Sequence, residues 1–284
     1  MIKVFYHPRQ TAKKNDSFSP SATKPQLVAD AFSKLPGVVI EENFPPATEE
    51  MLCRVHHPDY VKEVLNGTRP NGFGNRLPEI ADSLPWTSGS MVAAALYAIQ
   101  NTTASCSLTS GFHHAGYDYG SGFCTFNGLM VTTVELLRQG YKKIGILDLD
   151  AHFGDGTADI IQKLNLQTQV QHYTFGAEFR NFKTELEWLD SLAPVLLDKF
   201  SDVDVLLYQA GADPHSEDPL GGYLSTETMK DRDALVFVAC RNLRIPVAWN
   251  LAGGYQKPIE KVIALHVNTM IQCLEAWRPL VVRD

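Results

Sequence analysis

The chain has 284 residues, of which 44% are hydrophobic and 20% are charged, a composition typical of a globular protein that can form one large domain. No apolar run is long enough to span a bilayer, and the N-terminal residues lack the pattern of a secretion signal. The formal net charge of −7 argues against binding nucleic acid through a basic surface. Five widely spaced cysteines indicate thiols in a reducing compartment. We therefore expect a cytoplasmic protein that binds neither nucleic acid nor membranes.

Short β-branched runs alternate along the chain with longer helical patterns. Strands are expected at residues 2–6, 38–41, 105–109, 143–148, 169–174, 203–209 and 246–251. Helices are expected at residues 25–35, 58–65, 89–100, 126–139, 157–163, 184–200, 225–242 and 258–276. Several strands are almost entirely apolar, which is typical of parallel strands covered by helices on both faces. The alternation predicts a single α/β domain over residues 1–284, with three αβα layers around an open, mostly parallel sheet.

Two polar segments separate some of these elements and are expected to be loops. Residues 13–24 are rich in Ser and Pro, and residues 66–85 contain scattered Gly, Pro and Asn. Loops of this kind often line or cover a site.

Ligand-type side chains follow the expected strand 143–148. Asp148, Asp150 and His152 occupy alternate positions, so an extended backbone would turn them to the same side. Ligands of open parallel sheets bind beyond the carboxyl ends of the strands. Two carboxylates and a histidine at such an end predict a divalent metal site. A helix-capping loop would account for one acidic residue, such as Asp155, but not for all three.

Three other expected strands also end in residues that can carry chemistry. Asp213 follows a buried strand, where either a metal or an Asp-Pro turn would compensate its carboxylate. The adjacent His113 and His114, if they lie in a loop, can supply a proton-transfer base and a charge stabiliser. Residues Gly253–Tyr255 allow a close backbone approach and turn a phenol toward a ligand.

Taken in this order, the motifs resemble the histone deacetylase superfamily, including its bacterial acetylpolyamine and acetoin-utilisation relatives. The resemblance extends from about residue 50 to residue 260 and identifies the chain as a short bacterial-type member. It implies a zinc-dependent amidohydrolase with the arginase/deacetylase fold. The matching segments are Val55–Tyr60, Gly111–Ala115, Gly120–Cys124, Asp148–His152 with Gly154–Gly156, Gly211–Asp213 with Asp218–Pro219, and Leu251–Tyr255.

The resemblance also implies a metal centre. Asp150, His152 and Asp213 match the ligands of a single Zn²⁺, with Fe²⁺ as an alternative ion in the cell. Three protein ligands leave coordination positions open for water and the substrate carbonyl, as a catalytic site requires. Asp148 matches a residue of an inner monovalent-cation site, so K⁺ is a second expected ion.

The same resemblance assigns the acid–base and oxyanion roles. His114 matches the general base and acid of the family, and His113 matches its charge-stabilising partner. Asp155 and Asp148 match the carboxylates that orient His114 and His113 respectively. Tyr255 matches the phenol that donates to the developing oxyanion.

The expected substrate is an acetylated amine. Gly122 and Phe123 match a wall of the tunnel that takes the acyl-lysine side chain, and Gly253 and Gly254 are further expected substrate-binding residues. Leu220 stands where acetylpolyamine-selective eukaryotic members carry a glutamate. Its apolar side chain favours acetyl-lysine in a protein or peptide, or another small acylated amine, over a polyamine. An acetylpolyamine deacetylase stays as the alternative, and an oligomer is compatible with the sequence.

Two further alternatives differ in kind. Arginase-type ureohydrolases share the fold but need two manganese ions bridged by extra carboxylates, and the segments around Asp150 and Asp213 offer ligands for one. Phe153 stands where the family often has a second histidine. A non-catalytic binding module is the last alternative, although the complete metal, base and oxyanion positions argue against it.

Overall fold

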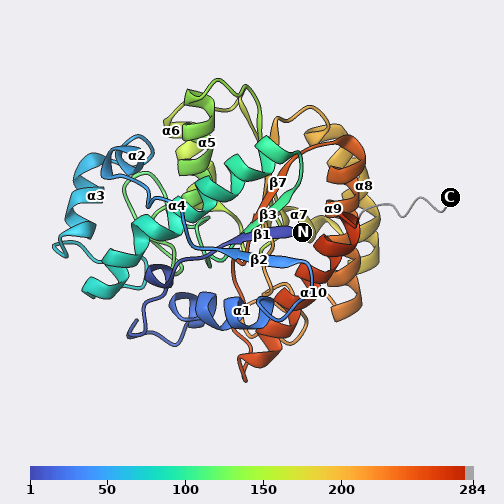
Figure 1. Cartoon of the computed structure of the whole chain (residues 1–284), viewed down its shortest axis with the longest axis horizontal. Coiled ribbons are helices and arrows are strands. Elements are labelled where there is room, and N and C mark those ends of the chain that lie inside the picture. The colour runs from blue at the N-terminus through green and yellow to red at the C-terminus, as the bar shows by residue number, and fades with distance from the viewer. Residues whose placement is uncertain (279–284) are drawn as a thin grey trace.

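Seven short strands pair side by side into one parallel sheet in the computed structural model, which describes residues 1–278. The strands are β1 (Ile2–Phe5), β2 (Val38–Glu41), β3 (Ala104–Ser107), β4 (Ile144–Asp148), β5 (Val170–Thr174), β6 (Val205–Gln209) and β7 (Val247–Asn250). Their order across the sheet is β2-β1-β3-β7-β6-β4-β5, and every pairing is parallel. The fold is therefore the expected three-layer α/β architecture (Figure 1).

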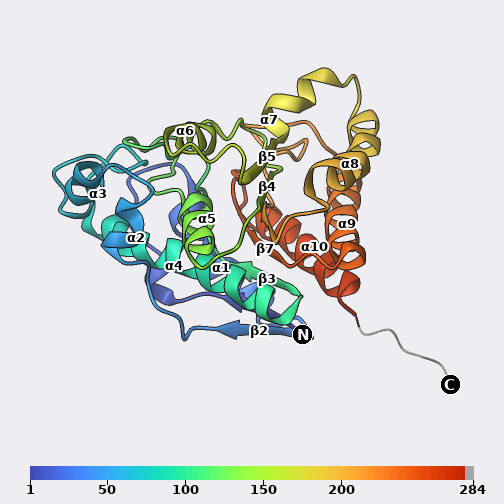
Figure 2. The same cartoon turned by 90° about the horizontal axis from the view of Figure 1, so that it is seen from above.

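Helices cover both faces of the sheet because alternate strand residues are apolar on both sides. In β6, Leu206 and Tyr208 belong to one apolar core, while Val205 and Leu207 belong to the other. One layer contains α1 (Lys24–Phe32), α8 (Glu185–Phe200), α9 (Thr226–Leu243) and α10 (Glu260–Ala276). The opposite layer contains α2 (Glu49–Cys53), α3 (Pro58–Leu65), α4 (Pro78–Asn101), α5 (Gly128–Arg138) and α6 (Asp155–Lys163), as Figure 2 shows from above.

Every strand and helix expected from the sequence is present, but the loop predicted for residues 66–85 is wrong in its second half. Helix α4 begins at Pro78, and its first turns include Pro85. Proline inside a helix removes one backbone hydrogen bond and usually ends it. Here the Pro85 carbonyl accepts a hydrogen bond from the Ala47 N–H at 2.8 Å, so a neighbouring loop packs against the helix at that point.

Two short helices were not predicted from the sequence. Helix α2 has five residues and α7 (Phe175–Glu178) has four, so neither completes enough turns to show a helical period. The prediction of one domain over residues 1–284 extends six residues beyond the described part of the chain.

The four strands that precede the candidate site residues are adjacent. Strands β3, β7, β6 and β4 are consecutive in the sheet, and their carboxyl ends meet at one edge. The segments after them carry His113 and His114, Tyr255, Asp213, and the pair Asp150 and His152. The sheet order therefore brings residues more than 140 positions apart to a single place.

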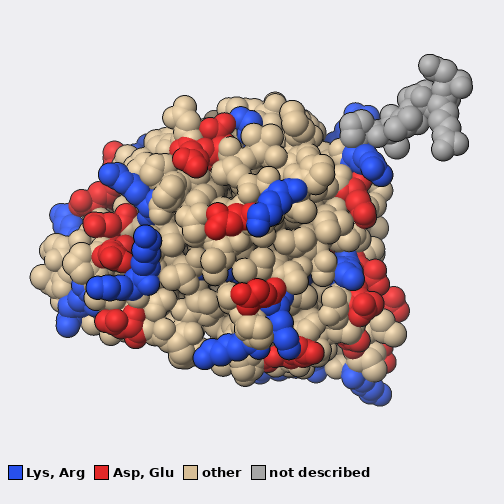
Figure 3. Space-filling model, turned by 60° about the horizontal axis from the view of Figure 1, so that its bottom comes forward, with Lys and Arg blue, Asp and Glu red and all other residues tan. Residues whose placement is uncertain are grey.

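Charged side chains, cysteines and helix hydropathy complete the description of residues 1–278. Basic and acidic side chains are interspersed on the face drawn in Figure 3. Across residues 1–278, the five cysteines are unpaired, and all except Cys53 are buried. None of the helices in that range has the length and hydropathy needed to cross a bilayer.

A buried ion pair on helix α9 contacts the backbone of the segment that follows strand β6. The Arg232 guanidinium donates to Asp233 at 2.8 Å and to the Gly211 carbonyl at 2.9 Å. Asp233 also accepts from the hydroxyls of Tyr208 and Thr269. Arg232 thus links α9 to the segment between β6 and Asp213.

Replacing Asp233 should destabilise the protein because it leaves the buried Arg232 charge without its partner. We expect Asp233→Ala to lower the free energy of unfolding by about 3–5 kcal/mol, measured by urea denaturation. The matched control is Asp231→Ala, at an exposed position two residues away on the same helix, which should change it by less than about 0.5 kcal/mol. Equal losses in the two variants would contradict a stabilising role for this pair.

Candidate active site

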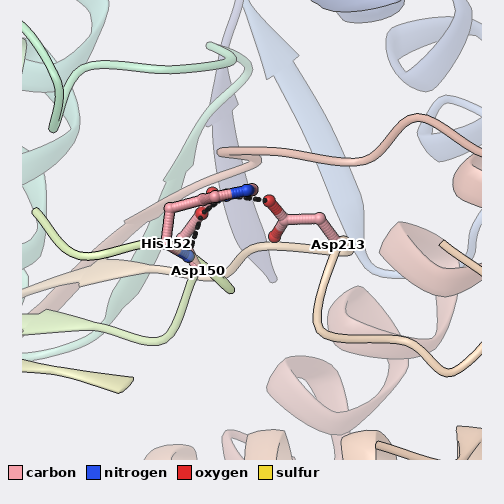
Figure 4. Close-up of side chains that lie close together, drawn as sticks. All are labelled: Asp150, His152 and Asp213. Atoms are coloured by element: carbon pink, nitrogen blue, oxygen red, sulfur yellow. Dashed lines mark hydrogen bonds and ion pairs between the residues drawn. The ribbon is translucent and has the colours of Figure 1, made fainter. Parts of the chain in front are cut away.

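Asp150, His152 and Asp213 converge at the carboxyl ends of the adjacent strands β4 and β6 (Figure 4). The Nδ1 atom of His152 lies 3.0 Å from Asp150 Oδ1 and 3.1 Å from Asp213 Oδ2. Both carboxylates are buried, whereas the His152 side chain is about one-third exposed. One ligand atom from each residue lies within 4.8 Å of the others, an arrangement suited to one metal ion.

The pKa values in this cluster indicate that the two carboxylates need a positive charge beside them. Burial and the neighbouring Asp150 raise the pKa of Asp213 to about 7. Hydrogen bonds to Asp150 and Asp213 raise the pKa of His152 to about 11. Two buried carboxylates at this distance need a nearby positive charge, and a divalent ion would supply it.

Backbone groups fix the two carboxylates in place and leave no room for a side chain beside them. Asp150 Oδ2 accepts from the Gly253 N–H at 2.9 Å, and Asp213 Oδ1 accepts from the Ala151 N–H at 3.1 Å. A Cβ on Gly253 would lie 2.2 Å from Asp213 Oδ2. Glycine is therefore required where this backbone passes over the carboxylates. Two carboxylates and an imidazole, held in this way, fit Zn²⁺ as a donor set.

Two histidine–carboxylate pairs lie beside the cluster. His113 Nδ1 lies 2.7 Å from Asp148 Oδ2, and His114 Nδ1 lies 2.6 Å from Asp155 Oδ1. Each bond occupies Nδ1, while Nε2 of His113 lies 3.6 Å from Asp150 Oδ1. The two rings lie 4.0 Å apart between centroids. Burial lowers the pKa of His113, but the adjacent carboxylates outweigh it and raise the value to about 9. The structure thus brings together His113 with Asp148 and His114 with Asp155, the two pairs that the resemblance implies.

Tyr255 lies at the end of a strained backbone segment. Ala252 has φ +51°, a left-handed conformation that is costly for a residue with a side chain. The buried Lys24 ammonium donates to the Ala252 carbonyl at 2.7 Å and to the Gly253 carbonyl at 3.2 Å. Burial and the nearby Asp213 and Asp150 raise the pKa of Tyr255 well above its ordinary value. These surroundings therefore favour the neutral, protonated form of its phenol.

Aromatic side chains surround the approach to these residues. The ring of Phe123 lies 5.8 Å from that of Tyr255, 5.3 Å from that of Phe18 and 5.7 Å from that of Phe73, between centroids. Phe18 is 65% exposed, although exposed phenylalanine is uncommon. These four rings form an apolar wall, called here the aromatic wall.

Three other expected substrate-binding residues, Gly122, Gly254 and Leu220, have different surroundings. A Cβ on Gly122 would lie 2.5 Å from the His114 ring, so this glycine permits close packing on the imidazole. Gly254 instead faces α10, where a Cβ would meet Val262 at 2.7 Å. Leu220 is 40% exposed, and the neighbouring Gly221 packs against the backbone of Asp213.

Sequence reasoning missed Lys24 and Phe18. Lys24 starts helix α1, where a lysine is normally exposed, and only its long-range contact with the Ala252 carbonyl reveals its role. Phe18 lies in the segment predicted as a polar loop, and a single phenylalanine in such a loop was the available signal.

Comparisons with known proteins agree with this geometry. Residues 20–179 match the model of the histone deacetylase domain family. An uncharacterized protein of Picosynechococcus sp. is 30% identical over 93% of this chain and 95% of its own length. The chain spans only 40% and 52% of two other curated relatives, a probable deacetylase of Archaeoglobus fulgidus (31% identical over 49% of this chain) and histone deacetylase 2 of Arabidopsis thaliana (30% identical over 64%).

Solved structures share the fold at low sequence identity. The HD domain of HDA15 superposes with a TM-score of 0.80 at 18% identity and covers 97% of this chain and 90% of its own. Acetylpolyamine aminohydrolase from Burkholderia pseudomallei has a TM-score of 0.72 at 18% identity, with 97% of this chain and 99% of its own covered. The family match spans more than half of the chain and includes the β3 and β4 segments of the site. The chain thus belongs to the histone deacetylase family.

Proposed function

We propose that the protein is a zinc-dependent hydrolase that removes the acetyl group from an acetylated amine. The observation that carries the proposal is the convergence of Asp150, His152 and Asp213 beside two histidine–carboxylate pairs. One Zn²⁺ would be held by these three side chains, with Fe²⁺ as the alternative. When bound, the metal would supply Lewis-acid chemistry, which polarises a carbonyl and lowers the pKa of water.

The protein's own groups account for the proton movements. His114, oriented through Nδ1 by Asp155, offers Nε2 as the base that takes a proton from the attacking water. The same nitrogen then returns the proton to the departing amine as the C–N bond breaks. His113, held by Asp148, lies against His114 and stabilises charge there. The Tyr255 hydroxyl donates to the carbonyl oxygen as it gains negative charge.

The surroundings of the site favour an aliphatic acylamine over a polyamine. Phe18, Phe153 and Leu220 are all at least 40% exposed, and each lies next to a site residue in space or in sequence. Such side chains favour the methylene chain of acetyl-lysine, and they give a polycation no counter-charge. Acetyl-lysine in a protein or peptide, or a small acylated amine, is therefore the proposed substrate. Acetylpolyamine is the alternative, and K⁺ near Asp148 stays a prediction.

Metal dependence tests the centre of the proposal. We expect one zinc per chain by elemental analysis, and acetate release from an acetyl-lysine peptide that stops with a chelator and returns with Zn²⁺. Asp213→Asn should weaken zinc binding by more than the roughly 10–100-fold that loss of an outer partner costs. Asp198→Asn, at an exposed position on α8, is the control. Two tightly bound manganese ions with urea release would point to a ureohydrolase instead.

Removing the Tyr255 hydroxyl tests the oxyanion role. Tyr255→Phe should lower kcat by about 10²–10³-fold while zinc content stays unchanged, because the lost donor acts on charge that develops in the transition state. Tyr97→Phe, remote on α4, should leave kcat unchanged. Full activity in Tyr255→Phe would reject the assigned role.

A charge at position 220 tests substrate choice. Leu220→Glu should raise kcat/KM for an acetylpolyamine relative to an acetyl-lysine peptide by up to about five-fold, since an exposed ion pair contributes at most ~1 kcal/mol. Leu220→Gln has nearly the same shape without the charge and should leave the ratio near that of the wild type. An equal rise of this ratio in both variants would show that the added negative charge is not the cause of the changed preference.

A further inference from the structure

Asp218 belongs to a motif that the proposed chemistry leaves without a role. It follows Asp213 by five residues and precedes Pro219, in the segment after β6. The side chain is buried, with 5% of the residue exposed. A buried carboxylate must be compensated by hydrogen bonds or a counter-charge. Its partners therefore indicate what it does.

Both carboxylate oxygens of Asp218 accept backbone N–H groups. Oδ2 accepts from the Tyr255 N–H at 2.7 Å, and Oδ1 accepts from the Leu220 N–H at 3.0 Å. Asp218 thus joins two segments 37 residues apart in sequence. One of them carries the proposed oxyanion donor and the other carries Leu220.

Asp218 completes a set of bonds that holds the segment from Ala252 to Tyr255. Lys24 binds two of its carbonyls, and the Ala212 N–H donates to the Gly253 carbonyl at 3.0 Å. The Gly253 N–H donates to Asp150. The direct side-chain bond to the backbone of Tyr255 comes from Asp218. A segment with φ +51° at Ala252 keeps its shape only where its surroundings determine it.

We propose that Asp218 is a positioning residue that sets where the Tyr255 hydroxyl lies relative to the substrate carbonyl. This inference rests on the proposed role of Tyr255 as oxyanion donor. The rings of Phe123 and Phe18 pack against the Tyr255 ring, and Asp218 binds the backbone from which the ring projects. A displacement of about 1 Å at a reacting centre can cost about 10²-fold in rate. The effect of Asp218 should therefore appear in kcat.

The test is a double-mutant cycle between Asp218 and Tyr255. Asp218→Asn turns one of its two acceptors into an amide N–H₂ that faces an N–H donor, and we expect kcat to fall roughly 10–100-fold with KM changed less than about three-fold. In the Tyr255→Phe background, the same substitution should cost less than about three-fold, because the group that it positions is absent. Zinc content should equal that of the wild type in all variants.

Asp204→Asn is the matched control for a merely structural effect. Asp204 also accepts two backbone N–H groups, from Lys142 and Lys143. It lies just before β6, at the amino ends of the strands and therefore at the end opposite to the site. We expect both aspartate variants to lower the urea midpoint and only Asp218→Asn to lower kcat. If Asp218→Asn does not fold, Asp218→Glu keeps the charge while it shifts the carboxylate by one methylene, and it should give a smaller loss of the same kind.

The outcomes separate the two proposals. An unchanged rate in Tyr255→Phe would reject the oxyanion role and this inference with it. A large loss in Tyr255→Phe, combined with wild-type kcat in Asp218→Asn or with fully additive losses, would overturn the positioning role of Asp218 and leave the proposed function intact.

Discussion

The structure of the site depends on two buried carboxylates that face each other. Asp150 and Asp213 come from adjacent strands, and one imidazole nitrogen lies within 3.1 Å of both. Two like charges in a buried site repel each other and lose their hydration, so the arrangement persists only with positive charge between them. The His152 ring lies beside both carboxylates, and a divalent ion held there would compensate their charge while binding all three side chains.

The backbone and the lysine beside those carboxylates are arranged closely around them. The Gly253 backbone passes over them so closely that a side chain would collide with Asp213. Next to this close approach, Ala252 has a left-handed conformation, and the buried Lys24 donates to its carbonyl. Lys24 is itself costly to bury, and desolvation lowers its pKa to about 8. The backbone strain at Ala252 and the burial of Lys24 thus occur beside the same two carboxylates.

The sequence predicted much of the fold because central strands such as β4 and β6 are buried on both faces and are nearly continuous apolar runs. All seven strands were located. The convergence of the strand-end residues followed from the rule that ligands bind at one edge of such a sheet. The prediction failed where tertiary contacts decide the outcome. Helix α4 continues through Pro85 against the usual preference, and α2 is too short for a period. Lys24 and Phe18 owe their roles to contacts with residues about 230 and 105 positions away, which no local pattern records.

The same fold can hold one metal ion or two. The number of metal-ligating side chains at the carboxyl ends of its strands therefore distinguishes a deacetylase from a binuclear hydrolase. Phe153, next to His152, is 44% exposed and has no ligand atom. His215 follows Asp213 closely, but it is buried, and its Nε2 lies 2.8 Å from the Thr226 hydroxyl. Its Nδ1 accepts from the Glu217 N–H, so both nitrogens are occupied away from the cluster. Among residues 1–278, Asp150, His152 and Asp213 form the one cluster of this kind, which suits a single ion with positions left for water and substrate.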